Sequence, residues 1–285
     1  MDHVITITKI YYKNDGLTIK EEKYYKDGIL HNDNDKPTII TYYEDGSIKT
    51  EQFYKNGKLH RDNNMPALIN YNISGLINSK QFIKNNELYR DNDQATTILY
   101  FSNGLIKSES FHKNNKQHRD GDKPSVIMYF DNNSSSIKSK TYYKNDKIHR
   151  IDKPAIITYY ENELIKTEQF YKDGKLHRDG KNPAEINYSE SGLIEYEAFY
   201  KNNELHRDNK PAIIEYYEDG SILSQDFYEN GKLLCNSDSL SNSNLCESNS
   251  DAESCDSDVE SCDSDVESCN IDVELLSYNT ERWNG

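Results

Sequence analysis

The chain has 285 residues, a formal net charge of −15, and a hydrophobic fraction of 34%, below the roughly 45–50% of ordinary globular domains. Its apolar residues are spread evenly along the chain, which excludes one large shared core. No window approaches the ~18 apolar residues of a membrane-spanning helix, so this class of membrane protein is also excluded.

The first residues, 1–12, alternate apolar with polar side chains and predict a β-strand that covers the open end of the structure that follows. They include an acidic residue at position 2 and lack the basic start and apolar run of a secretory signal. We therefore expect a protein that is cytoplasmic and not secreted.

One sequence unit is repeated along the chain. The segment 37–62 returns almost unchanged at 154–179 and, with small changes, at 211–232. All six prolines and six of the eight histidines recur in two slots, and six of the seven arginines recur in a third at intervals of 29, 29, 31, 28 and 29 residues. We predict an N-terminal strand and partial repeat over 1–33, seven complete repeats over 34–236, and a separate tail over 237–285.

Each unit predicts strands and turns without a helix. Residues 38–43 and 47–55 have strand composition, and Asn56-Gly57 is typical of a type I′ hairpin turn. We expect the same turn at Asp45-Gly46, Asp173-Gly174, Asp219-Gly220 and Asn230-Gly231, and at Asn85-Asn86, Asn114-Asn115 and Asn202-Asn203. The predicted fold is all-β: an elongated antiparallel meander or solenoid of β-hairpins, about 29 residues per unit.

The segment Tyr54-Lys-Asn-Gly-Lys-Leu-His60 has counterparts at 171–177 and 25–31. It resembles the Tyr-x-x-Gly-x-x-His core of MORN repeats, most closely the MORN-variant arrays found in bacteria and in large amoeba-infecting DNA viruses. The resemblance covers about residues 5–236 and implies a binding or membrane-associated repeat protein. This chain departs from the family pattern by placing Arg-Asp, where MORN repeats have glycines, after the histidine.

The Arg slot and its neighbours supply the candidate binding residues: His60, Arg61, Asp62, Arg90, His118, Arg119, His149, Arg150, His177, Arg178, His206 and Arg207. The His-Arg-Asp triplet also occurs in the catalytic loop of protein kinases, but the Gly-rich loop, the strand lysine and Asp-Phe-Gly are missing. We favour a structural ladder, in which each arginine pairs with a carboxylate or lies over an aromatic ring, and keep a ligand groove as the alternative. One histidine per unit does not supply the converging ligands of a zinc site.

The tail has thirteen acidic residues and one basic residue, a net charge of −12, which leaves −3 for residues 1–236. Its low hydrophobicity predicts disorder. Cys255, Cys262 and Cys269 recur at intervals of seven, and a heptad coiled coil is the alternative. Each of the candidate phosphorylation sites has an acidic residue three positions later: Ser250, Ser257 and Ser264.

We predict a non-enzymatic repeat scaffold that binds a protein partner along the array and needs no cofactor. The alternatives are a membrane-associated MORN-type adaptor and a neutraliser of a basic toxin or host protein through the acidic tail. Nucleic acid and membrane partners are not expected, because the array is near neutral and the tail is acidic.

Overall fold

The computed structural model describes residues 3–13, 16–33, 35–132 and 135–236, which belong to one unit that spans Met1–Cys246. Within these residues every regular element is a β-strand, and no helix occurs. The predictions about the tail, its coiled-coil alternative and its candidate phosphorylation sites lie outside the described residues.

In the described part of the chain, 18 strands form one large sheet. These strands are β1 (Ile5–Tyr11), β2 (Ile19–Lys26), β3 (Ile29–Leu30), β4 (Ile39–Tyr42), β5 (Ile48–Gln52), β8 (Leu68–Tyr71), β9 (Ile77–Gln81), β12 (Thr97–Tyr100), β13 (Ile106–Ser110), β16 (Val126–Tyr129), β17 (Ile137–Thr141), β20 (Ile156–Tyr159), β21 (Ile165–Gln169), β24 (Glu185–Tyr188), β25 (Ile194–Ala198), β28 (Ile213–Tyr216), β29 (Ile222–Glu229) and β30 (Lys232–Asn236).

The remaining described strands are short and form six two-stranded sheets. These small hairpins are β6 (Tyr54–Lys55) with β7 (Lys58–Leu59), β10 (Ile83–Lys84) with β11 (Glu87–Leu88), β14 (His112–Lys113) with β15 (Lys116–Gln117), β18 (Tyr143–Lys144) with β19 (Lys147–Ile148), β22 (Tyr171–Lys172) with β23 (Lys175–Leu176), and β26 (Tyr200–Lys201) with β27 (Glu204–Leu205).

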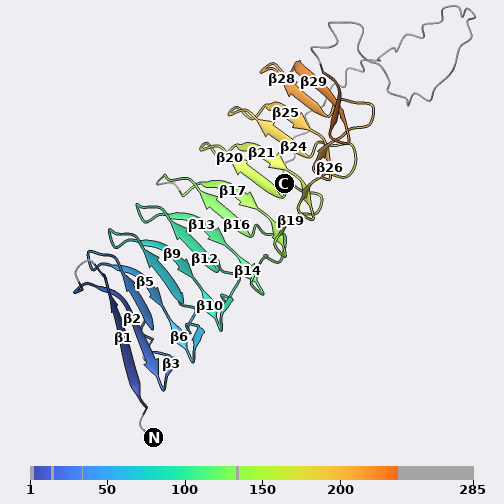
Figure 1. Ribbon diagram of the computed structural model, residues 1–285. Coiled ribbons are helices and arrows are strands. Elements are labelled where there is room, and N and C mark those ends of the chain that lie inside the picture. Colours follow the sequence, from blue (N-terminus) through green and yellow to red (C-terminus); the bar gives the residue numbers. More distant parts are fainter. Residues whose placement is uncertain (1–2, 14–15, 34, 133–134, 237–285) are drawn as a thin grey trace, which may run out of the picture. The chain divides into compact units, whose positions relative to one another are not determined.

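The large sheet is a meander in which each unit contributes two strands. Within a unit, Ile40 of β4 pairs with Glu51 of β5, and Glu51 pairs on its other side with Ile69 of the next unit. The same antiparallel register recurs to β28 and β29, so successive units lie side by side in chain order (Figure 1). The predicted long antiparallel meander of β-hairpins is therefore confirmed.

The prediction of one continuous strand over 47–55 is wrong, because the strand is divided at Phe53. The Phe53 N–H donates to the Ala67 carbonyl of the next unit (2.8 Å), whereas the Phe53 carbonyl accepts from the His60 N–H (2.9 Å). Phe53 therefore bonds both to the next unit and to its own small hairpin, and the chain leaves the large sheet there. The small hairpins follow one another along the array in chain order (Figure 1).

The turns of the small hairpins have the predicted geometry. Asn56 and Gly57 both have positive φ, at 52° and 75°, as a type I′ turn requires. Asn85 and Asn86 keep positive φ without glycine, and the Asn86 side-chain oxygen accepts from the Leu59 N–H of the preceding unit (2.7 Å). Asparagine therefore adds a bond between units that glycine cannot make.

The same turn does not occur at Asp45-Gly46 or Asp219-Gly220, where the sequence predicted it. Only the glycine has positive φ in these two pairs. Asp45 Oδ1 instead accepts from the backbone N–H (2.9 Å) and the hydroxyl (2.6 Å) of Ser47. A short acidic side chain thus braces a longer turn, which is a common role for aspartate.

The core is a thin layer repeated from unit to unit. One cluster contains Phe53, Ala67, Ile69 and Ile83, which are 0–8% exposed. The slot that follows each proline, or Ala95 in the unit that lacks one, holds a small residue that is at most 2% exposed: Thr38, Ala67, Thr96, Ser125, Ala155, Ala184 and Ala212. This small slot lets the backbone of one unit approach the aromatic ring of the preceding unit.

Candidate functional site

The predicted His-Arg-Asp residues lie in one row of loops. Each triplet directly follows the second strand of a small hairpin and precedes the next strand of the large sheet. Because the units are joined strand by strand, equivalent loops of successive units are neighbours (Figure 1). We call these six loops the loop row: 60–66, 89–95, 118–124, 149–154, 177–183 and 206–211.

The histidines of the loop row connect neighbouring units. His177 Nε2 lies 2.9 Å from Asp179 Oδ1, and His177 Nδ1 accepts from the Asn202 N–H of the next unit (3.1 Å). These roles place the proton of a neutral imidazole on Nε2. The same pair of contacts recurs at His31, His60, His118 and His206.

The arginines lie flat on aromatic rings. The Arg119 guanidinium carbon is 3.6 Å from the centre of the Phe111 ring, and Arg119 Nη1 donates to the Pro124 carbonyl (3.2 Å). Stacking of this kind suits the planar guanidinium. The other five pairs lie 3.6–3.7 Å apart: Arg61 on Phe53, Arg90 on Phe82, Arg150 on Tyr142, Arg178 on Phe170 and Arg207 on Phe199.

Three arginines also hold a carboxylate from the preceding loop. Arg150 Nε and Nη2 donate to the two Asp122 oxygens at 2.7 and 3.1 Å. The Arg150 guanidinium, with Lys153, lowers the pKa of Asp122 to about 2. Arg61 binds Asp35 and Arg119 binds Asp93 in the same two-pronged geometry.

The aspartates of the triplet bind within their own unit. Asp62 accepts from His60 Nε2 (2.9 Å) and from Lys55 Nζ (2.7 Å), and these contacts lower the Asp62 pKa to about 2. A carboxylate held ionised by two donors is poorly suited to act as a general base near neutral pH.

The second loop, 89–95, departs from this pattern at several slots. Asn64 stands where the preceding loop of three other arginines has aspartate, and Arg90 Nε is buried with no hydrogen-bond partner among the described residues. Burial lowers the pKa of Arg90. Tyr89 replaces the histidine, and its hydroxyl donates to Asp91 (2.8 Å). The fourth loop also differs, because Ile151 replaces the aspartate and His149 Nδ1 lies 3.3 Å from Asp173 instead.

Open clefts separate consecutive loops of the row. Their volumes are ≈390 Å³ between the loops of Arg119 and Arg150, ≈360 Å³ between those of Arg150 and Arg178, and ≈410 Å³ between those of Arg178 and Arg207. Within the described ranges, no group of three or more His, Cys, Asp or Glu side chains could hold a metal ion. The loop row thus offers charged, repeated clefts built from equivalent residues.

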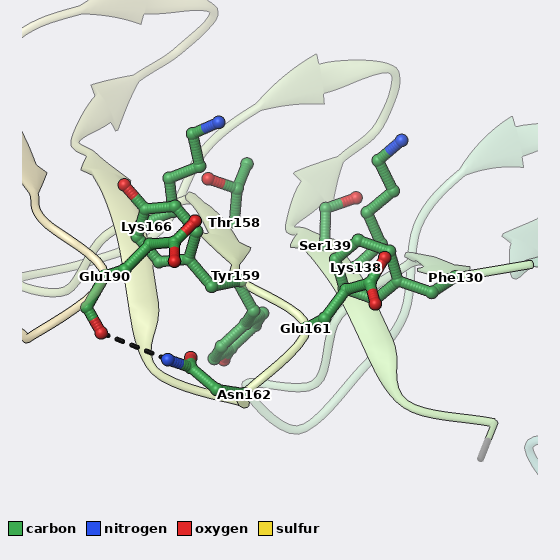
Figure 2. Close-up of a pocket in the computed structure, with 10 residues that line it drawn as sticks. Phe130, Lys138, Ser139, Thr158, Tyr159, Glu161, Asn162, Lys166 and Glu190 are labelled. Carbon is green, nitrogen blue, oxygen red and sulfur yellow. Dashed lines mark hydrogen bonds between the residues drawn. The ribbon is translucent and has the colours of Figure 1, made fainter. Parts of the chain in front are cut away.

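Another cleft, of ≈820 Å³, lies beside the turns that follow β16, β20 and β24. Figure 2 shows Lys138 and Lys166 on its lining, with Asn162 donating to the Glu190 carbonyl (3.0 Å). The Glu161 and Glu190 carboxylates balance the two lysines. This cleft therefore has mixed charge.

The lysines at the ≈820 Å³ cleft belong to a pattern that was not predicted from the sequence. Lys138 lies 5.8 Å from the Phe130 ring centre and Lys166 lies 5.3 Å from that of Tyr160, and three other units have the same pair: Lys20 with Tyr12, Lys49 with Tyr43 and Lys107 with Phe101. Where the aromatic residue is lost, at Asn72 and Ser189, the lysine slot holds Asn78 and Glu195. The paired loss could have been found from the sequence by comparing the two slots.

A partly buried row of Tyr–Glu contacts was also missed. The Tyr71 hydroxyl donates to Glu51 of the preceding unit (2.7 Å), and burial followed by this hydrogen bond raises the Tyr71 pKa. Equivalent contacts join Tyr42 to Glu22, Tyr129 to Glu109, Tyr188 to Glu168 and Tyr216 to Glu197. Where lysine replaces the glutamate, it lies over the tyrosine ring: Lys80 on Tyr100 and Lys140 on Tyr159.

The comparisons with known proteins agree with the repeat found in the sequence. The model of the MORN repeat variant family matches residues 38–60, which include the β4–β5 hairpin and end at His60, and residues 213–230, which include β28 and β29. The resemblance to MORN-variant repeats is therefore confirmed at these two segments. Such repeats are in general non-catalytic and serve protein interaction or membrane binding. Curated proteins give no match to the chain.

Proposed function

We propose that this protein is a non-catalytic repeat scaffold that binds partner proteins along its β-array. The observation that carries the proposal is the repeated use of the same polar side chains. His, Arg and Asp of the loop row make equivalent contacts in unit after unit, whereas catalysis requires one distinct constellation of acid, base and nucleophile.

The arrangement of the clefts supports binding over an extended surface. Three consecutive clefts of similar volume follow the loop row, and each is lined by equivalent residues from two neighbouring units. Stacked repeats commonly present such surfaces to elongated partners. We propose a cytoplasmic location with this function; no helix among the described residues has the length and apolar character needed to cross a bilayer.

Two other functions follow from the family and the composition. MORN-type membrane association is disfavoured by charge, because residues 1–236 have a net charge of −3 and 237–285 a net charge of −12, which an anionic membrane surface repels. Neutralisation of a basic protein would rest on the acidic segment 237–285, outside the described residues. Such binding would be fast and sensitive to salt.

The proposal can be tested by capturing partners from a lysate of the natural source or host on the immobilised full chain, in low and in high salt. Cross-linking then maps the residues that contact each partner. We expect partners that cross-link within residues 35–236. Partners that are lost in high salt and cross-link only within 237–285 would contradict the scaffold and favour neutralisation. Binding to anionic lipid vesicles would favour the membrane function.

A further inference from the structure

The third and fourth loops of the row pair most of the cations around them with carboxylates. Lys113 pairs with Asp120 (2.7 Å), Lys123 with Asp93 (2.8 Å) and Lys153 with Asp122 (3.0 Å). The arginines of these loops, Arg119 and Arg150, hold the same carboxylates, Asp93 and Asp122 respectively. Few positive charges there are left to attract an external anion.

The last two loops differ. Lys181, Lys201 and Lys210 all line the cleft of ≈410 Å³, and no ion pair involves any of them within the described ranges. The two carboxylates of this cleft are already engaged: Asp179 by Lys172 and His177, and Asp208 by His206. Three lysines thus converge on one cleft without a carboxylate of their own.

Arg178 lies between this cleft and the preceding one, of ≈360 Å³. It lies on Phe170 and donates through Nη1 to the Pro183 carbonyl (3.0 Å), and among the described residues no carboxylate bonds to it. Asp152 occupies the sequence position equivalent to Asp122 and lines the preceding cleft, but its loop is one residue shorter and it does not reach Arg178. The two nitrogens that hold an aspartate in three other loops are therefore open here.

The molecule itself shows which chemistry this slot accepts. Asp35, Asp93 and Asp122 each place a carboxylate against the Nε and Nη2 edge of an arginine that lies on an aromatic ring. A carboxylate from outside can take the same position at Arg178. The negative charges nearby are Asp152 in the preceding cleft, Asp179 and Asp208, which already have partners, and Glu168 and Glu197, which act on Arg178 without bonding to it. The neighbouring lysines, which make no ion pair among the described residues, add electrostatic attraction for such a carboxylate.

We propose that the two clefts around Arg178, the C-terminal clefts, bind an extended acidic peptide segment of a partner protein. Arg178 takes one Asp or Glu carboxylate in two-pronged geometry, and Lys181, Lys201 and Lys210 attract the next. This inference rests on the proposed scaffold function and names the partner chemistry. Units repeat every two strands, or about 10 Å, which three extended residues also span, so acidic residues three apart match the spacing of the clefts.

The test uses the full chain and a fluorescent twelve-residue peptide with Glu at every third position and Gly or Ser elsewhere, followed by fluorescence anisotropy at low ionic strength. The triple variant K181Q/K201Q/K210Q should bind about tenfold more weakly than the wild type. The matched variant K113Q/K123Q/K153Q removes the same charge from paired lysines and should stay within about twofold. R178K keeps the charge but loses the two-pronged contact and should weaken binding about threefold.

Three results would overturn the inference. They are no binding of the peptide to the wild-type chain, equal weakening by the two triple variants, and tighter binding of an oligothymidylate of equal charge. The same peptide with Gln in place of Glu should not bind. Loss of peptide binding while partners still cross-link within 35–236 would remove this inference and leave the scaffold function standing.

Discussion

The loops around Arg119 and Arg150 and the loop around Arg178 have the same backbone plan, but their arginines differ in whether they bond to an aspartate. Each arginine lies 3.6–3.7 Å from an aromatic ring and donates to the carbonyl of the proline that follows. The first two hold an aspartate of the preceding loop, whereas Arg178 holds none within the described residues. The same arginine slot can therefore either join two units or lack a carboxylate partner among the described residues, and the loop that precedes Arg178 is one residue shorter than the loop that precedes Arg150.

The largest expected effect tests what the two regions share. Phe111→Ala and Phe199→Ala each remove a ring that is 6% exposed and lies beneath an arginine. Both should lower the free energy of unfolding by about 3–5 kcal/mol, because each leaves a cavity between units. Urea unfolding followed by circular dichroism measures the change. A much smaller loss at Phe199 would show that the last units are not packed like the central ones.

The next largest effect distinguishes the loop in which an aspartate bonds to Arg150 from the loop in which none bonds to Arg178. Asp122→Ala removes the partner of Arg150 and should lower the free energy of unfolding by about 1–3 kcal/mol, since the guanidinium is only 12% exposed. Asp152→Ala, the matched change one loop later, should cost less, because it breaks no ion pair among the described residues. The two aspartates have similar positive φ, 52° at Asp122 and 54° at Asp152, so the backbone cost of alanine is common to both variants. Thermal unfolding of both variants checks this, and equal losses would disprove the difference between the loops.

A smaller effect comes from giving Arg90 of the second loop the carboxylate that it lacks. Asn64→Asp gives Arg90 the carboxylate that Arg119 and Arg150 have and should raise the free energy of unfolding by about 0.5–1.5 kcal/mol. The backbone permits it, because φ of Asn64 is 58° and aspartate tolerates that region. Asn63→Asp, with the same φ and the same added charge, is the control. A melting temperature that rises equally in both would show that the contact is not formed.

The smallest expected effect is a pH dependence of the stability that the Asp122–Arg150 ion pair provides. The pKa of Asp122 lies near 2 in the folded chain, below its ordinary value of 3.8, because Arg150 and Lys153 bond to it. A lowered folded pKa gives stability that is complete above pH 3.8 and is lost as the pH falls towards 2. The melting temperature of Asp122→Asn should therefore fall less than that of the wild type between pH 4 and 2. Parallel curves would contradict this linkage.

Much of the fold could be predicted from the sequence because the repeat fixes which strands are neighbours. The spacing of Arg61 and its successors sets the unit, and Asn56-Gly57 sets a hairpin turn whose φ values match the type I′ prediction. The break at Phe53 could not be predicted from composition. It arises because the Phe53 N–H and carbonyl bond to different units, which is a tertiary effect.

The recurring residues of the candidate site can be identified from the sequence, but the contacts that they make cannot. The sequence shows that His177, Arg178 and Asp179 recur in slots, and it suggested rings or carboxylates as partners for arginine. It does not show that the Arg150 carboxylate comes from Asp122, 28 residues earlier, or that Asp152 fails to make the equivalent bond. That difference depends on loop geometry between units.

Whether Arg178 lacks the carboxylate partner that Arg119 and Arg150 have can be tested directly by NMR. The quantity to measure is the exchange rate of the arginine Nε protons, on the full chain with assigned side-chain signals. We predict slow exchange for Arg119 and Arg150, whose Nε–H groups donate to Asp93 (3.0 Å) and Asp122 (2.7 Å), and fast exchange for Arg178. Addition of the acidic peptide should slow the exchange at Arg178 alone. Equal protection of Arg150 and Arg178 in the free protein would contradict the account, because Arg178 would then already have a partner of its own.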